Sequence, residues 1–131
     1  MDFMMKNCLL CMSLVFAGCA GHVTSSLQVD GAPFAATTCR AGQASGFSGV
    51  ELSDDHGQRL RLAQNLDGSF AGAYFPSGSP IGDNLGACGT LNVQPGFAVV
   101  NGVRDIEGSV TLACKTERHQ VSGKAWFQHC H

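Results

Sequence analysis

The sequence predicts an all-β fold, a small antiparallel sandwich or barrel of about seven short strands held together by two disulfides. Three observations support this prediction. Polar and apolar residues alternate with a period of two far more often than with the period of a helix. Turn-forming Gly, Pro, Asn and Asp residues recur about every ten positions. Four cysteines, Cys39, Cys88, Cys114 and Cys130, lie downstream of a segment typical of protein export.

The first predicted strands lie in the N-terminal half of the β domain. Residues 46–52 alternate and end at the turn cluster Ser53-Asp54-Asp55-His56-Gly57. Residues 58–66 form the next strand, and the leucines expected on its buried face are Leu60, Leu62 and Leu66. Asp67-Gly68 predicts a two-residue hairpin turn, because Gly adopts positive φ readily and Asp tolerates it. The chain then returns through residues 70–75.

A second group of strands follows the loop at residues 76–80, whose two prolines lack the N–H groups that a strand ladder needs. Residues 86–93 are predicted to form one strand. Asn101-Gly102 indicates another tight turn, between residues 97–100 and residues 103–106.

The last hairpin, which turns at residues 115–118, separates the two faces of the sheet most clearly. The residues predicted to point inward are Val110, Leu112, Cys114, Val121, Gly123, Ala125 and Phe127. Those predicted to point outward from the second arm are Ser122, Lys124, Trp126 and Gln128. The only Trp of the chain is thus expected among polar neighbours, either packed beneath the loop at residues 76–80 or available to a partner. We predict a partner contact at Trp126, Lys124 and Gln128, since exposed Trp is enriched at binding hot spots.

Residues 1–18 have the composition of a cleaved export signal. Lys6 is the cation of the head region, and the apolar run at residues 8–17 is about half as long as a membrane-spanning helix. No later segment has the roughly 20 consecutive apolar residues that such a helix needs. The sequence therefore predicts a signal peptide followed by one exported domain.

The end of this segment, Val15-Phe16-Ala17-Gly18-Cys19-Ala20, resembles the lipobox of bacterial lipoproteins. The resemblance implies that diacylglycerol is attached to the Cys19 sulfur, that the Gly18–Cys19 bond is cut, and that the protein stays anchored in a lipid bilayer. Several acyl chains make such anchoring effectively permanent. By the same resemblance, Ala20 in place of Asp favours the outer membrane. The alternative is ordinary cleavage after Ala20, which would release the protein from the membrane.

Residues 19–37 show no sustained period and are mainly small, polar or turn-forming, so we expect a lipidated flexible tether there. The disulfide-stapled β domain is expected at residues 38–131. Its segments 101–114 and 121–130, each a Gly-containing strand that ends on Cys, are similar to small all-β lipoprotein domains of gliding soil bacteria, the myxobacteria. That resemblance implies a role at the cell envelope or surface, and it includes the motility apparatus among the settings.

The four cysteines of the β domain form an even set in an exported protein, which predicts two disulfides, with free buried thiols as the alternative. A hairpin at Asn101-Gly102 brings Cys88 within one position of Cys114, and a bulge near Pro95 would align the two. The turn that follows Cys114 sends Cys130 about ten residues along the ladder, roughly 30 Å away and too far to bond. The predicted pairs are therefore Cys88–Cys114 and Cys39–Cys130.

Composition and motifs argue against nucleic-acid binding and against the common enzyme classes. The formal net charge is −2, and the Lys and Arg residues are scattered singly, so no basic patch is available for nucleic acid. The sequence has no nucleophile elbow, zinc-protease helix, phosphate loop or dinucleotide fingerprint. Ser53, Asp54 and His56 crowd one turn and cannot adopt the geometry of a catalytic triad. We therefore expect no catalytic residue and no cofactor.

No metal site is expected either. The four cysteines lack the Cys-x-x-Cys spacing of zinc modules. His129 and His131 project on the same side of an extended chain, but two imidazoles without a third ligand make a weak site, and the alternative is an exposed C-terminus. Arg59 and Arg61 share a strand face and are expected to be solvated.

Together these observations predict a non-enzymatic lipoprotein that is anchored to the outer membrane through Cys19 and binds a protein of the cell envelope. The alternative function is an inhibitor of a partner enzyme, such as a lysozyme or a protease, in the periplasm or at the surface. A carrier of a metal or another small ligand is a third hypothesis.

Overall fold

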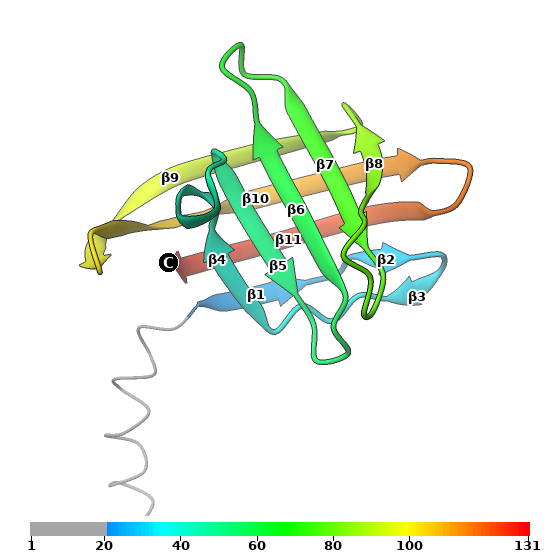
Figure 1. Ribbon diagram of the computed structural model, residues 1–131, viewed down its shortest axis with the longest axis horizontal. Coiled ribbons are helices and arrows are strands. Elements are labelled where there is room, and N and C mark those ends of the chain that lie inside the picture. The colour runs from blue at the N-terminus through cyan, green and yellow to red at the C-terminus, as the bar shows by residue number, and fades with distance from the viewer. Residues whose placement is uncertain (1–20) are drawn as a thin grey trace, which may run out of the picture.

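The structure is a computed structural model that describes residues 21–131. The predicted signal peptide at residues 1–18 and the predicted lipidation site Cys19 lie outside the described residues. Residues 21–131 form two antiparallel sheets packed face to face, and the strands of one sheet cross those of the other obliquely (Figure 1). The predicted all-β sandwich is therefore confirmed.

The sheet in front in Figure 1 is a five-stranded meander, in which each strand pairs with its neighbours in the sequence. Its strands are β4 (Thr38–Ala41), β5 (Gly49–Ser53), β6 (Arg59–Gln64), β7 (Phe70–Phe75) and β8 (Asp83–Gly86), and the 3-10 helix η1 (Gly42–Ser45) connects β4 to β5. The predicted strand at residues 70–75 coincides with β7. The turn before it is wider than Asp67-Gly68, because the Asn65 N–H still donates to the Ser69 carbonyl at 2.8 Å.

The sheet behind it has six strands and is built around the C-terminal strand. Two consecutive hairpins are formed by β9 (Gly89–Val100), β10 (Val103–Lys115) and β11 (Gln120–Cys130). On the other side of β11, β1 (His22–Ser25) and β2 (Gln28–Val29) pair with it one after the other, and β3 (Ala32–Pro33) pairs with β2. The first and the last strands of the described chain are therefore neighbours.

The predicted tether at residues 19–37 is wrong for the part that the structure describes. Residues 22–33 contribute three strands, and Leu27 and Phe34 are each only 1% exposed. Small and polar residues hide the strand character of this segment, because β1 and β2 depend on pairing with β11 more than on their own pattern. The β domain therefore begins near His22 and not at residue 38.

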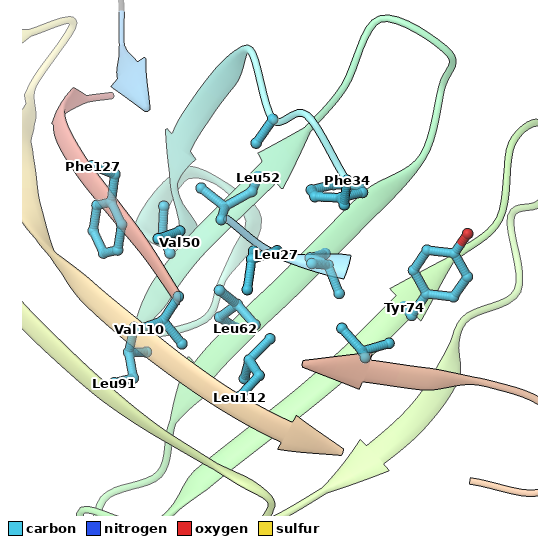
Figure 2. Packing of buried hydrophobic residues seen from close by; sticks show 14 of the residues in the cluster. Leu27, Phe34, Val50, Leu52, Leu62, Tyr74, Leu91, Val110, Leu112 and Phe127 are labelled. Atoms are coloured by element: carbon cyan, nitrogen blue, oxygen red, sulfur yellow. The ribbon is translucent and has the colours of Figure 1, made fainter. Parts of the chain in front are cut away.

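The core lies between the two sheets and is filled by alternate residues of both (Figure 2). Its nearly inaccessible side chains include Val50, Leu52, Leu60 and Leu62 from one sheet and Val110, Leu112, Val121, Ala125 and Phe127 from the other. Burying a Val or Leu side chain contributes about 1.5 to 3 kcal/mol, so the alternation that predicts these strands also stabilises the sandwich. Leu66 was expected beside Leu60 and Leu62, but it is fully exposed because β6 ends at Gln64.

Both predicted disulfides are confirmed. Cys39 of β4 bonds to Cys130 of β11, with their Cα atoms 5.1 Å apart, and this bond joins the two sheets. Cys88, which directly precedes β9, bonds to Cys114 of β10.

The bulge expected near Pro95 is also present. The register of β9 and β10 shifts between the Arg104–Val99 pair and the Ile106–Pro95 pair. The shift is one position larger than alignment of the cysteines requires, so Cys88 lies beside Ala113, whose N–H donates to the Cys88 carbonyl at 3.0 Å. Pro95 is tolerated there because β9 is an edge strand.

The β9–β10 hairpin extends beyond the rest of its sheet. Ile106 pairs with Cys130 at the end of β11, so no strand of the described chain pairs on that side with the residues between Ile106 and the Asn101-Gly102 turn. Phe97 is 99% exposed, and Val99 and Val100 are exposed with it. This hairpin tip, residues 97–103, therefore carries apolar side chains into the solvent.

Candidate functional site

Trp126 lies on the outer face of the six-stranded sheet. It is 53% exposed, whereas its neighbours Ala125 and Phe127 are buried, as the alternation along β11 predicts. The predicted orientation of Trp126 towards solvent is therefore confirmed. The loop at residues 76–80, which was the alternative cover for the ring, connects two strands of the other sheet, and the indole is open.

The register of the strands places Trp126 in a row of polar side chains that crosses four strands. Trp126 pairs with Thr24 of β1 on one side and with Ser109 of β10 on the other, and Ser109 pairs with Asn92 of β9. Directly paired residues of antiparallel strands point to the same face, so these four side chains share the outer surface. With strands about 4.8 Å apart, the row is roughly 14 Å long.

A second polar row lies beside the first. Gln94 pairs with Glu107, and Gln128 pairs with His22. Between these two pairs the register of β10 and β11 shifts, and His129 adopts a φ of 56°. Such a bulge increases the local twist of the sheet. The two rows line an open groove of about 480 Å³ on the outer face.

The polar side chains of the groove have no hydrogen-bond partners among residues 21–131. The side chains concerned are His22, Thr24, Asn92, Gln94, Glu107, Ser109, Trp126 and Gln128. Asn and Gln each offer donors and an acceptor, Ser and Thr hydroxyls do both, a carboxylate accepts and the indole N–H donates. The groove therefore presents many unused donors and acceptors around one aromatic ring.

The outer face of the five-stranded sheet is different, because three of its charged side chains, Glu51, Arg59 and Arg61, contact one another. Glu51 Oε2 lies 3.6 Å from Arg59 Nη1 and 3.2 Å from Arg61 Nη2. The guanidinium of Arg59 lies 4.3 Å from the centre of the Phe75 ring, and that of Arg61 lies 5.0 Å from the centre of the Phe47 ring. The expectation that both arginines are simply solvated is therefore wrong. Of the two outer faces, the groove is the stronger candidate site.

Two of the three predicted contact residues line the groove. Trp126 and Gln128 do so, whereas Lys124 pairs with Thr111 one row further along β11 and lies at the border. Sequence reasoning missed the residues that come from β1, β9 and β10, because only the register of four strands brings them together. The polar residues at outward positions of those strands were a signal of an exposed surface. Alternation alone, however, does not show that residues of different strands lie side by side.

His129, one of the two histidines considered for metal binding, has another partner. Asp105 is only 2% exposed, its Oδ1 accepts the Ala98 N–H at 3.0 Å, and its Oδ2 lies 3.1 Å from His129 Nδ1. These contacts hold the β9–β10 hairpin against the end of β11. Within residues 21–131 no three His, Cys, Asp or Glu side chains form a group that could hold a metal ion.

The turn that contains Ser53, Asp54 and His56 serves the local structure. Asp54 Oδ1 accepts the backbone N–H groups of His56 at 2.9 Å and Gln58 at 2.8 Å, in the manner of an Asx turn. Ser53 Oγ lies 2.6 Å from Thr38 Oγ1. His56 Nδ1 lies 3.9 Å from Asp54 Oδ2, but Ser53 is engaged with Thr38, so the three side chains do not form a triad.

A second acid–histidine contact lies where the six-stranded sheet meets β7. Asp30 Oδ2 lies 3.0 Å from His119 Nδ1, and Asp30 Oδ1 accepts the Gln120 N–H at 2.8 Å. The hydrogen bond with His119, followed by that with Gln120, lowers the pKa of Asp30. The His119 ring packs edge-on against Tyr74 with ring centres 4.8 Å apart. Burial, and then the negative charges of Asp30 and Asp54, raise the pKa of Tyr74.

No family model, curated protein or solved structure matches this chain. In the part of the chain from residue 21 to residue 131, no helix is long and apolar enough to cross a membrane. The groove around Trp126 is thus identified as a candidate site by its own geometry.

Proposed function

We propose that this protein is a non-enzymatic binding lipoprotein of the cell envelope, and that it holds an envelope component in the groove around Trp126. The observation that supports this proposal most directly is the half-exposed indole among polar side chains that have no partner in the described chain. Trp combines a large apolar surface with a hydrogen-bond donor, and it is enriched where one protein surface binds another molecule. A partner with matching donors and acceptors would form hydrogen bonds with these groups.

The arrangement of the groove favours binding over catalysis. Glu107 and His22 are the titratable side chains of its lining, and β11 lies between their strands, which separates them by roughly 10 Å. General acid–base catalysis needs both groups within hydrogen-bond reach of one reacting centre. Within residues 21–131, the Ser109 hydroxyl has no hydrogen bond to a histidine or a carboxylate, so it lacks the activation that a nucleophile requires.

The lipid anchor at Cys19 is the second part of the proposal. It is supported by the lipobox-like residues 15–20, and Ala20 favours the outer membrane as the location. We expect the Cys19→Ala variant to move into the soluble fraction or to accumulate unprocessed, and to incorporate no labelled palmitate. Unchanged membrane association together with unchanged labelling would contradict the anchor.

A photo-cross-linking amino acid in place of Gln128 tests the groove in the cells that produce the protein. Gln43, which is exposed in η1, is the matched control position. We expect a cross-linked product from position 128 that is absent from position 43 and disappears when Trp126→Ala is added. A structural envelope component in the product supports the proposal, whereas a lysozyme or a protease would identify the protein as an inhibitor of that enzyme. The same products from both positions would contradict the groove as the binding site.

A further inference from the structure

We propose that the groove around Trp126 binds a neutral oligosaccharide, so that the envelope component held there presents a glycan. This inference rests on the proposed function, because it assigns the same groove to one chemical class of ligand. The aromatic ring, the charge of the lining and the length of the groove each support it.

The indole of Trp126 offers a platform for a sugar ring. The flat face of a pyranose carries C–H groups with a small positive charge, and these are attracted to the negative face of an aromatic ring. The edge of the same sugar is a ring of hydroxyl groups. Asn92 and Ser109 on one side of Trp126, and Thr24 on the other, lie in the same row, so a sugar stacked on the indole has polar groups on both sides.

The charge of the lining indicates a neutral ligand. Among the described residues that line the groove, Glu107 is the only carboxylate, and none is Lys or Arg. A phosphate or an acidic sugar would therefore find no ammonium or guanidinium within the lining to pair with, because Lys124 lies only at its border. Amide and hydroxyl groups both donate and accept, as sugar hydroxyls do, and five such side chains surround Trp126: Thr24, Asn92, Gln94, Ser109 and Gln128.

The groove is long enough for several sugar units. The row that contains Trp126 crosses four strands and is roughly 14 Å long. The second row, with Gln94 and Gln128, runs beside it and gives the groove its volume of about 480 Å³. A single sugar would leave most of these donors and acceptors unused, so a short oligosaccharide lying along the rows matches the groove better.

The chain contains a single Trp, so the fluorescence of the purified full-length protein reports on the groove directly. The probes are neutral tetrasaccharides of glucose, galactose and N-acetylglucosamine, and a lysine-rich tetrapeptide that could use Glu107 and the indole face instead. We expect a saturable change in fluorescence with at least one tetrasaccharide. Asn92→Ala and Gln94→Ala should each weaken that binding by roughly 2- to 13-fold, and the control Gln43→Ala should leave it unchanged.

Titration calorimetry extends the test to the Trp itself. Trp126→Ala should weaken binding by about 25-fold or more, and Trp126→Phe, which keeps an aromatic face, by less. Thermal melts identify any variant that does not fold, and the remaining variants then decide the question. No saturable response to any of the tetrasaccharides, or a response that survives Trp126→Ala, would overturn the proposal.

Binding of the tetrapeptide in place of the sugars, with loss in Glu107→Gln, would overturn the saccharide as ligand and make the groove a site for cationic peptides. In that case the photo-cross-link from position 128 would persist, so the proposed function would stand while this inference failed. Absence of both the cross-link and any titration response would contradict the two together.

The structure also assigns the tip of the β9–β10 hairpin to a lipid surface. This second proposal has a separate basis, which is the exposed apolar side chains of residues 97–103, and it rests on the lipid anchor of the proposed function. Phe97 is 99% and Val99 is 57% exposed, and the neighbouring turn is Asn101-Gly102. Transfer of such exposed apolar side chains from water into a bilayer is energetically favourable.

The tip lies at the end of the domain from which the chain leads back to Cys19. His22, the first residue of β1, pairs with Gln128, and the tip extends roughly 15 Å beyond the end of β11 at this same end (Figure 1). The three residues from Cys19 to His22 span at most about 10 Å. An acylated Cys19 therefore holds the bilayer surface at a level that the tip reaches.

The charge around the tip also suits a bilayer. Residues 94–104 contain no acidic side chain, and exposed Arg104 follows the apolar residues directly. A guanidinium at this position can remain among anionic headgroups while Phe97 and the valines enter the acyl boundary. The Asp105–His129 contact fixes the base of the hairpin, so the tip is presented in one orientation.

Quenching by brominated lipids tests this contact in the lipidated full-length protein, reconstituted into vesicles of phosphatidylethanolamine and phosphatidylglycerol. Trp126→Phe removes the native Trp, and Phe97→Trp then places a single Trp at the tip. The matched control is Leu66→Trp, because Leu66 is fully exposed in the β6–β7 turn, whose residues Gly68 and Ser69 lie beside the opposite end of β9. We expect strong quenching and a blue shift at position 97 and neither at position 66.

Palmitate labelling of the same samples separates the two possible failures. With label present, an unquenched Trp at position 97, or equal quenching at both positions, would overturn the membrane contact and leave the anchor intact. Without label the anchor itself would be contradicted, and the membrane contact of the tip would fail with it.

Discussion

Replacing Cys39 and Cys130 together by Ala should lower the free energy of unfolding by about 4.6 kcal/mol. The bond joins residues 91 positions apart, and a cross-link that closes a loop of this length restricts the unfolded chain by that amount in the loop-entropy description. The Cys88–Cys114 bond closes a loop of 26 positions, so its removal should cost about 3.5 kcal/mol. Domains of this size are stable by roughly 5 to 15 kcal/mol, so the first loss removes a large share of the total.

Urea unfolding under oxidising conditions, followed by far-UV circular dichroism and by the fluorescence of Trp126, measures both losses. The two pairs act as each other's control, because each variant removes one disulfide and leaves the other. The Cys39–Cys130 variant must be the less stable of the two, by about 1 kcal/mol. A Cys88–Cys114 variant that is equally or more destabilised would refute the argument from loop length. It would show that packing of the sulfurs, or structure in the unfolded chain, determines the cost.

Three further substitutions test the buried core, the close contact between Gly108 and the Asn92 carbonyl, and the Asp30–His119 contact. Leu62→Ala should cost about 3 to 5 kcal/mol because its side chain is wholly buried, while Leu66→Ala should change stability by less than about 0.5 kcal/mol; equal effects in urea unfolding would refute the assigned core. Gly108→Ala should cost about 1 to 3 kcal/mol, since its new Cβ would collide with the Asn92 carbonyl, and an unchanged melting temperature would contradict that packing. Asp30 has a lowered pKa in the folded state, so its contribution is fully present above its unfolded value of about 3.9 and is lost as the pH falls through the lowered value. Asp30→Asn should therefore reduce the loss of stability on acidification, and melts that fall equally steeply for both proteins would contradict this.

The strands that carry their own alternation could be predicted from the sequence. β7 has the predicted bounds, and the inward and outward positions of β10 and β11 follow the pattern of their residues. The strands that form only because a neighbouring strand is present could not be predicted in this way. β1 and β2 are short and polar, and only the free edge of β11 makes them strands. The prediction that Leu66 is buried was wrong for a related reason. A leucine that continues an apolar pattern can lie just beyond the last paired residue of a strand.

The candidate site was predictable in part. Alternation along one strand was enough to place Trp126 and Gln128 on the outer face, because it requires no knowledge of the neighbouring strands. Asn92 and Glu107 could not be added from the sequence. The position of Asn92 opposite Ser109 depends on the size of the β9–β10 bulge, and Glu107 lies within the β10–β11 bulge. The lipobox-like residues remain a sequence-based prediction, because they precede the described residues.

The pairing of β1 with β11 has a consequence for the order in which the domain can assemble. Val23 lies opposite Phe127, so β1 must wait until about a hundred more residues have been synthesised before it can pair. Until then Leu27 and Phe34 have no sheet to cover, and contacts between such distant residues form slowly. A chain that stops before Gln120 would lack the strand that holds β1 and β2, and it would expose two edges that readily pair with other chains. Synthesis of β11 is thus the event that closes the fold.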